Sequence, residues 1–310
     1  MPAPMIDVLI ATRTRDMILG CLGDLGAQTA AHRIFVADNG GNADGTSDAI
    51  RAQFPEVEVL TLERNLGFGA AMNRLAAMGS AELIVLVNDD VTLEPQFLQA
   101  LSGPLADAGV GMVAGLTLQP VGGEVVDGFG IEADPTLTAY NRLRHQSPDA
   151  TPGRLLGPSG AAAAYRRTAF EAACGFDTRL FVYAEDLDLA LRLRNAGWRA
   201  AAAPHARAVH LGGATAGMDS AFQRRHAAFG RGFILRRYGV LRTRHAPRAL
   251  GLEALTVLFG ILRSRSAVPL GARIAGWRAA GTGPRLPIPG GAVDTQISAR
   301  EALRRQRFER

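Results

Sequence analysis

The 310-residue sequence contains no lysine, so all 34 of its basic side chains are arginines. With its abundant alanine and glycine, this bias is typical of a GC-rich bacterial genome, and no single arginine by itself indicates a bidentate contact. Only two cysteines are present, Cys21 and Cys174, and neither has the spacing of a metal or redox motif. We expect both to be reduced thiols in the core of a cytoplasmic protein.

Long apolar runs are also missing. The most apolar stretch, residues 249–262, has 14 positions and includes one Glu, whereas a membrane-spanning helix needs about 20 residues. The N-terminus has no basic segment followed by an apolar one, so we expect no signal peptide. The hydrophobic content of 47% is enough for a large core and predicts one large domain, alone or with an appendage.

Charge is divided unevenly along the chain. Residues 1–223 hold 16 Arg against 25 Asp and Glu, whereas residues 224–310 hold 18 Arg against four acids. A basic segment attracts polyanions such as nucleic acid, an anionic membrane face or a lipid phosphate. It has few aromatic residues and no recognition motif, so a nucleic-acid-binding protein is the less favoured alternative and no nucleic acid is expected as a partner.

We place a domain boundary where the basic part begins. Residues 1–240 are expected to form the main domain, and residues 241–310 a basic helical extension. Within the extension, the 249–262 stretch has arginines at both ends and would either lie in a membrane interface or dock on the main domain. The last 30 residues are expected to be a loosely ordered tail with a short Arg-rich helix.

Continuous apolar runs alternate with helix-like segments in the first half of the chain. Such runs are typical of strands that are buried on both faces of a mostly parallel sheet. Their order predicts an α/β fold, a Rossmann-like, mixed but mostly parallel sheet flanked by helices. The expected strands are 7–11, 33–37, 57–62, 83–87 and 110–116, and the expected helices are 15–27, 46–53, 67–78 and 95–103.

The second half of the chain is less regular. Residues 117–160 are rich in Gly and Pro and predict a loop or β-hairpin region that crosses the site. A helix is expected to begin near Arg167, and the clearest helical pattern of the chain covers 184–198. A short strand should end before Pro204, and a further helix is expected over 218–238.

Polar residues follow four of the expected strands. In parallel strands these positions share one edge of the sheet, which is where ligands of such folds bind. Asp89 and Asp90 are adjacent, and burial would raise their pKa values unless a cation neutralised them. Mn²⁺ or Mg²⁺ would do so, taking one or two carboxylates and completing its shell with substrate phosphates. The four groups are Thr12 and Arg13, Asp38 and Asn39, Arg64 and Asn65, and Asn88 with the two aspartates.

Two glycine-rich segments belong to this edge. Asp38 precedes Gly-rich turn residues, and its carboxylate would accept hydrogen bonds from a nucleobase or ribose, or would simply stabilise the turn. Gly67 and Gly69 lie at an expected helix start, where the backbone would approach a phosphate closely. A G-x-G pattern alone is a weak signal.

A pair of carboxylates and one histidine are further candidates for catalysis or metal binding at the site. Glu185 and Asp186 begin the 184–198 helix, where they would cap the helix or act as a general base on a hydroxyl. His210 follows a short apolar run and would complete a metal shell together with Asp90. A single histidine is more often structural.

The motifs together resemble those of family 2 glycosyltransferases with the GT-A fold, in the rhamnosyltransferase-like branch. The segments "VLIATRTRD", "FVADNGGNADGT", "ERNLGFGAAMN", "LVNDDV", "GPSGAAAAYRRTAFEAACGFDTRLFVYAEDLDLALRLRNAGW" and "VHLGG" occur in the family's order. The resemblance spans about residues 5–240. It departs from the family in the triplet Asn88-Asp89-Asp90, which is not of the D-x-D form, and in "TRTRD" at the first strand.

The resemblance implies a role for each matched residue. Asp186 would be the catalytic base, with Glu185 beside it on the acceptor side, and Asp90 would hold the metal ion. The nucleotide would be bound by the remaining matched positions: Asp38 at the nucleobase, Thr12 and Arg13 in the same pocket, Asp89 at the ribose, Asn65, Gly67 and Asn88 nearby, and His210 as a further metal or diphosphate contact.

The resemblance also implies an activity, an inverting transfer of a sugar from a nucleotide-diphosphate donor to a hydroxyl of a glycan or polyprenyl-linked acceptor. The branch makes dTDP-rhamnose a candidate donor and leaves UDP- and GDP-sugars open. Such enzymes build bacterial cell-wall or other polysaccharides at the inner face of the membrane, where the basic extension would bind anionic lipid. A sugar nucleotidyltransferase of similar fold is the alternative, although the Gly-rich loop such enzymes carry after the first strand is missing.

Overall fold

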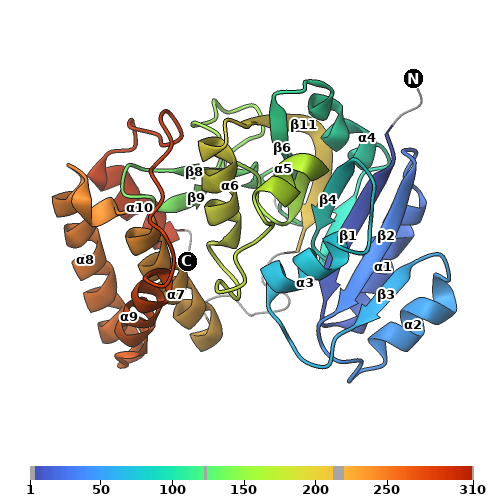
Figure 1. Cartoon of the computed structure of the whole chain (residues 1–310), viewed down its shortest axis with the longest axis horizontal. Helices are drawn as coiled ribbons and strands as arrows, with labels where there is room; N and C mark the ends of the chain where they lie inside the picture. The colour runs from blue at the N-terminus through green and yellow to red at the C-terminus, as the bar shows by residue number, and fades with distance from the viewer. Residues whose placement is uncertain (1–3, 122–123, 212–219, 309–310) are drawn as a thin grey trace.

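The computed structural model describes residues 4–121, 124–211 and 220–308 and has a mixed β-sheet at its centre (Figure 1). Within these residues, nine strands form one sheet in the order β3-β2-β1-β4-β10-β6-β11-β5, with β7 beside β6, while β8 and β9 pair separately. The strands are β1 Ile6–Thr12, β2 His32–Asp38, β3 Glu58–Thr61, β4 Leu83–Val87, β5 Val91–Leu93, β6 Val110–Leu118, β7 Val126–Gly128, β8 Ile131–Ala133, β9 Ala139–Asn141, β10 Ala162–Arg166 and β11 Arg199–His210.

Strand direction divides the sheet into two parts. Strands β3, β2, β1 and β4 are parallel to one another, and β11 is parallel to β6. Strand β10 lies between β4 and β6 and is antiparallel to both. The mixed α/β architecture is the predicted one, and the parallel part brings the carboxyl ends of β1, β2 and β4 to one edge.

Helices cover both faces of the sheet, because its central strands are apolar on both sides. In β1, Val8 and Ile10 contact the core beneath α1, α2 and α4, while Leu9 faces the core beneath α3, α5 and α6. The α-helices are α1 Arg15–Gly26, α2 Thr46–Gln53, α3 Phe68–Ala76, α4 Phe97–Ser102, α5 Arg167–Ala172, α6 Glu185–Asn195, α7 Ala221–Arg237, α8 Ala246–Ser264, α9 Val268–Ala280 and α10 Ala299–Phe308.

Three local expectations were wrong. Strand β3 is only partly buried, because it is the edge strand of the sheet. Strand β11 does not end before Pro204 but runs through it, with a shift of register between Ala203 and Arg207 that removes the need for a proline N–H. Cys174 is exposed and has a φ of 58°, so it lies in a turn after α5, whereas Cys21 is buried as expected.

The region 117–160 does contain a hairpin, formed by β8 and β9. The helix expected over 218–238 is observed as α7, and its first expected residues lie outside the described part of the chain. None of the helices that the structure describes is both long and apolar enough to cross a bilayer.

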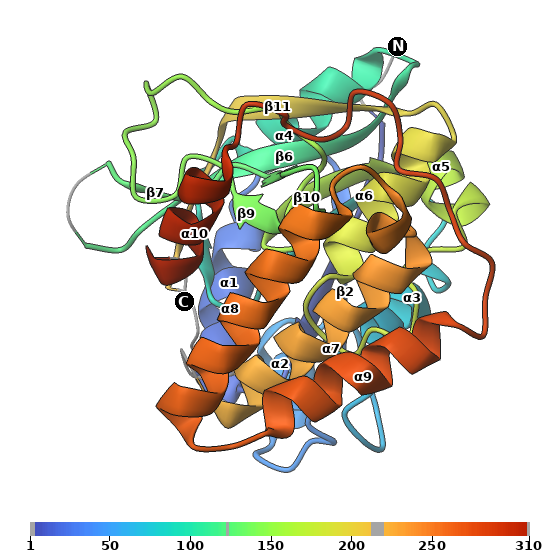
Figure 2. The same cartoon turned by 90° about the vertical axis from the view of Figure 1, so that its left-hand side faces the viewer.

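The C-terminal helices pack on the rest of the protein. In Figure 2, α8 and α9 lie in front of α7. Helices α7 and α9 touch backbone to backbone, since a Cβ on Gly232 would lie 2.0 Å from the carbonyl oxygen of Arg273, and one on Gly276 would lie 1.9 Å from that of Phe229. The glycines therefore allow this crossing, and α9 is held against α7.

The tail is also attached more firmly than expected. Ala302 of α10 is fully buried against Tyr140 of β9, and Arg305 forms an ion pair with Glu132 of β8. The expected Arg-rich helix is confirmed, but it covers the β8–β9 hairpin and is not loosely ordered. The division of the chain at residue 240 stays a prediction.

Candidate functional site

The site begins at the carboxyl ends of the parallel strands. The hydroxyl of Thr12, at the end of β1, donates a hydrogen bond of 2.6 Å to Oδ2 of Asp89, which follows β4. Both side chains are buried. Burial, together with the neighbouring charge of Asp90, raises the pKa of Asp89 to about 6, although the Thr12 hydrogen bond opposes this. The end of β4 thus places the carboxylates of Asp89 and Asp90 next to each other, and burying both in the charged form costs free energy.

Asp38 lies at the end of β2, on the same edge. Its Oδ1 accepts a hydrogen bond of 3.0 Å from the N–H of Gly40, and its Oδ2 accepts one of 2.6 Å from the hydroxyl of Ser47. A carboxylate has about four acceptor positions, so these contacts orient the side chain without using it up. Ser47, in the first turn of α2, is a contact that the sequence pattern did not indicate.

Asn65 and Gly67 shape the loop before α3. The side-chain oxygen of Asn65 accepts a hydrogen bond of 2.8 Å from the N–H of Gly67, which has a φ of 83°. A Cβ on Gly67 would lie 2.2 Å from the carbonyl oxygen of Phe181, and one on Gly69 would lie 2.7 Å from Cβ of Phe176. Protein atoms therefore fill the space left by both glycines, and contact with a phosphate stays a prediction.

Asp90 and His210 meet where β5 and β11 pair. Nε2 of His210 lies 3.2 Å from Oδ1 of Asp90 and 3.4 Å from the side-chain nitrogen of Asn88. On its other side, Nδ1 of His210 is 2.7 Å from Oδ2 of Asp127. Burial opposes protonation of His210, but the hydrogen bond to Asp127 and the charge of Asp90 outweigh it and raise the pKa of His210 to about 9.

These residues fit a divalent cation that is completed by substrate. Oδ1 of Asp90 is buried and, within the described residues, accepts no hydrogen bond of good geometry. Asp127 orients the imidazole from behind, as carboxylates commonly do for metal-binding histidines. No group of three or more His, Cys, Asp or Glu side chains in the described part of the chain is arranged to hold a metal ion. The protein atoms that could contact a cation here are Oδ1 of Asp90 and Nε2 of His210.

Glu185 and Asp186 lie at the start of α6, after a strained turn. Tyr183 and Ala184 have φ values of 67° and 72°, a region that residues other than glycine seldom adopt and that is frequent at functional sites. Burial and the proximity of Asp186 raise the pKa of Glu185 to about 8, and burial also raises the pKa of Asp186. Helix α7 supports the turn, since a Cβ on Gly230 would lie 2.8 Å from the carbonyl oxygen of Tyr183.

One cavity joins two of these parts, the side chains around His210 and the start of α6. It has a volume of about 600 Å³ and is lined by Asn88 and His210 at the strand edge, and by Glu185 and Asp186 at α6. The β8–β9 hairpin lines a further side, as expected for the region 117–160, and α7, α8 and α9 line the far end. Thr12, Asp38, Asp89 and Asp90 lie at the strand ends but are not part of this lining, and the side chain of Arg13 is exposed.

The fold is that of the GT-A glycosyltransferases. A mannosyltransferase from Pyrobaculum calidifontis, solved in complex with GDP-mannose and Mn²⁺, matches 92% of this chain and 77% of its own with a TM-score of 0.55 at 20% identity. GalNAc-T7, solved with UDP, GalNAc and Mn²⁺, matches 76% of this chain and 48% of its own with a TM-score of 0.59 at 13% identity. At such identities the likeness concerns the fold.

Sequence comparison adds the family. The family model described as "Glycosyltransferase like family 2" matches residues 2–230. An N-acetylglucosaminyl-diphospho-decaprenol L-rhamnosyltransferase of Mycobacterium tuberculosis is 32% identical over 216 residues, which cover 61% of this chain and 69% of that protein. An N-acetylglucosaminyltransferase of Rhizobium leguminosarum is 26% identical over 225 residues, covering 66% and 50%. The chain belongs to the family 2 glycosyltransferases, and the predicted family, GT-A fold and enzyme class are confirmed.

Proposed function

We propose that this protein transfers a sugar from a nucleotide-diphosphate donor to a hydroxyl group of a lipid-linked or glycan acceptor, with inversion at the anomeric carbon. The observation that carries the proposal is the cavity that joins His210, which lies 3.2 Å from Asp90, to the Glu185–Asp186 pair. One end suits the diphosphate of a donor, and the other suits proton removal from an acceptor. The rhamnosyltransferase relative makes dTDP-rhamnose the first donor to test, ahead of UDP- and GDP-sugars.

Asp90 and His210 would hold a Mn²⁺ or Mg²⁺ ion at the donor end. When bound, the cation neutralises the diphosphate and stabilises it as a leaving group. Asp38, Thr12 and Asp89 would bind the nucleoside, because their carboxylate and hydroxyl groups lie at the ends of adjacent strands.

Asp186 would act on the acceptor. It takes the proton of the acceptor hydroxyl while the oxygen forms a bond to the anomeric carbon, and the bond from that carbon to the diphosphate oxygen breaks. One displacement from the opposite face inverts the configuration. The raised pKa of Asp186 makes its carboxylate a better base than an exposed aspartate.

Two substitutions test these assignments separately. Asp186→Asn preserves the shape of the side chain and removes its basicity, so turnover should fall about 10²- to 10⁴-fold while donor affinity stays unchanged. Asp90→Ala should instead abolish donor binding that depends on Mn²⁺, measured by calorimetry with and without the metal. Glu171→Gln, an exposed carboxylate on α5, is the control. Normal turnover of Asp186→Asn would show that the base is another group.

We also propose that the C-terminal helices bind the anionic inner face of the cell membrane. On α8 and α9, eight large apolar side chains of the described residues are exposed, among them Leu258 at 56% and Leu262 at 68%. Phe259 is both exposed and part of the cavity lining, so this surface continues into the site. A membrane there would bring a lipid-linked acceptor to the cavity. The eight are Leu250, Leu255, Leu258, Phe259 and Leu262 of α8, and Val268, Leu270 and Ile274 of α9.

Co-sedimentation with vesicles that contain phosphatidylglycerol tests the membrane proposal. A chain cut near Tyr238 would expose the α7 face that α9 covers, so substitutions in the full chain are preferable. The double variant Leu258→Asp, Leu262→Asp should lose most of its binding, whereas Met78→Asp, an exposed apolar residue after α3, should not. The proposal would be contradicted if the double variant, Met78→Asp and the unmodified protein all bound the vesicles equally well.

A further inference from the structure

Two arginines and one glutamate form a buried charged group at the far end of the cavity. Nε of Arg231 on α7 donates a hydrogen bond of 2.6 Å to Oε1 of Glu253 on α8, and Nε of Arg273 on α9 donates one of 2.8 Å to Oε2. Their side chains are only 13%, 15% and 15% exposed, and all three line the cavity. The single acid of the apolar stretch 249–262 thus joins three helices.

The charges of this group do not balance. Two guanidinium groups share one carboxylate, and the pKa of Glu253 lies below its ordinary value, because the two arginines outweigh the opposing effect of burial. The group therefore keeps a net positive charge in a largely buried place. Buried charges are normally paired, so an excess cation beside a cavity favours an anionic ligand.

Arg231 also has an unused donor. Its Nη1 donates hydrogen bonds of 2.9 Å to the carbonyl oxygens of Thr136 and Leu137 in the β8–β9 turn. Its Nη2 is buried and, within the described residues, has no hydrogen-bond acceptor. An unpaired buried donor is costly, and the planar guanidinium presents its N–H groups in the geometry that phosphate oxygens accept.

The group of Arg231, Glu253 and Arg273 lies at the end of the cavity where the acceptor is proposed to bind, near α6. Helix α6, which carries Glu185 and Asp186, lies between the sheet and the C-terminal helices (Figure 1). Arg231 directly follows Gly230, the residue of α7 that touches the turn before Glu185. The donor end, with Asp90 and His210, lies at the sheet. The cavity thus has His210, which contacts Asp90, at the sheet and a cationic group at the helices.

We propose that Arg231 and Arg273 bind the diphosphate of an isoprenoid-linked acceptor, so that its sugar lies at Asp186 and its chain leaves along α8. The inference rests on the proposed function and specifies the acceptor. Thr256, Phe259 and Pro269 line the cavity beside the arginines and connect it to the exposed apolar surface of α8 and α9. A diphosphate attached to an isoprenoid chain matches a cationic group that adjoins an apolar exit.

Calorimetry on the full-length protein, with EDTA and without a sugar nucleotide, tests this inference. The probes are farnesyl diphosphate, farnesol and inorganic pyrophosphate. Farnesyl diphosphate should bind at least about tenfold more tightly than either of the others, because only it offers both groups. Arg273→Gln should weaken its binding by about tenfold or more, and Arg278→Gln, an exposed arginine of the same helix outside the cavity lining, should not change it.

A second variant gives a change in the opposite direction. Glu253→Gln removes the carboxylate that competes for both arginines, so farnesyl diphosphate should bind several-fold more tightly, which a purely structural role of Glu253 would not produce. Tighter binding by Glu253→Gln would support the inference even if Arg273→Gln did not fold. The inference is overturned if neither variant changes the affinity, if farnesol binds equally well, or if pyrophosphate binds equally well. Mn²⁺-dependent donor binding by the unmodified protein, measured separately, shows whether the proposed function stands.

Discussion

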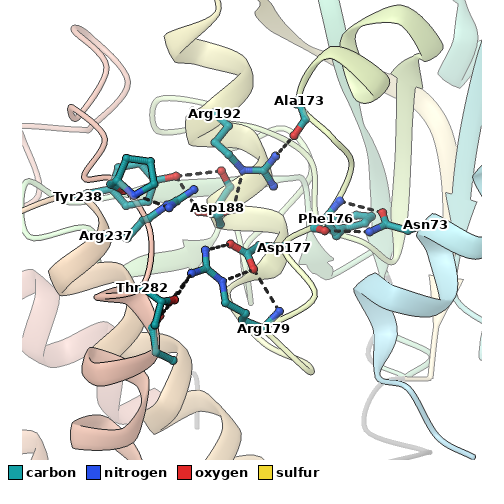
Figure 3. A network of polar contacts seen from close by, with 12 residues as sticks. Asn73, Ala173, Phe176, Asp177, Arg179, Asp188, Arg192, Arg237, Tyr238 and Thr282 are labelled. Carbon is teal, nitrogen blue, oxygen red and sulfur yellow. Dashed lines mark hydrogen bonds and ion pairs between the residues drawn. The ribbon is translucent and has the colours of Figure 1, made fainter.

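The phenolic oxygen of Tyr238 lies 2.8 Å from Oδ1 of Asp188 and donates a hydrogen bond to it (Figure 3). Tyr238 directly follows α7, and Asp188 lies in α6, one turn after Glu185. Asp188 is fully buried, and its Oδ2 accepts a further hydrogen bond of 2.7 Å from Nε of Arg192. The helix that carries the proposed base is therefore fixed to the helix that supports the turn before it.

Tyr238→Phe should destabilise the protein by about 1–3 kcal/mol, because it leaves a buried carboxylate oxygen without its donor. Urea unfolding should show a lower midpoint with an unchanged slope. A double-mutant cycle with Asp188→Asn separates this hydrogen bond from other effects. Additive losses from the two substitutions would show that the pair does not interact.

The buried carboxylate of Glu185 should make stability depend on pH. Its pKa is about 8 in the folded protein against 4.5 as the ordinary value, so between these pH values the folded state holds a proton that the unfolded chain has released. This contribution therefore lowers stability as pH rises through the window. Glu185→Gln removes this pH-dependent contribution. The difference in unfolding free energy, variant minus unmodified protein, should therefore be more favourable to the variant at pH 8 than at pH 5. Urea unfolding at both pH values measures this, with Glu171→Gln as a control that should show no such difference.

Asp127→Asn should weaken metal-dependent donor binding by about 10- to 100-fold, because the imidazole of His210 loses the carboxylate that orients it. Calorimetry with donor and Mn²⁺ measures the loss, and the same titration in EDTA shows whether it depends on the metal. Full metal-dependent affinity in this variant would mean that His210 does not need Asp127, or does not bind the metal.

Gly276→Ala should destabilise the protein by about 1–3 kcal/mol or more, because the new methyl group would overlap the backbone of Phe229 on α7. Gly271→Ala on the same helix is the matched control. No described atom lies within 4 Å of its new methyl group, so alanine should be neutral or stabilising there. Thermal unfolding compares the two, and equal effects would contradict the close α7–α9 contact.

Much of the fold could be predicted from local patterns. The apolar runs of β1, β2 and β4 and the polar residues behind them are properties of short segments, so Thr12, Asp38 and Asp89 could be placed at one edge before the structure was known. The same holds for Glu185 and Asp186 at a helix start. Cys174 and Pro204 were misjudged because their surroundings depend on a turn and on a shift of register.

The sequence by itself determined most of the elements, the family and the acidic residues proposed for the site, because periodicity and motif order depend on consecutive positions. Only the tertiary structure decided that Asp127 lies behind His210 and that Glu253 joins Arg231 to Arg273. Those partners are 20 to 83 positions apart. Contacts between residues so far apart in the sequence depend on how strands and helices pack. A side chain such as Asp127 therefore cannot be assigned a role from its own segment, because the role depends on the charged group that the fold brings next to it.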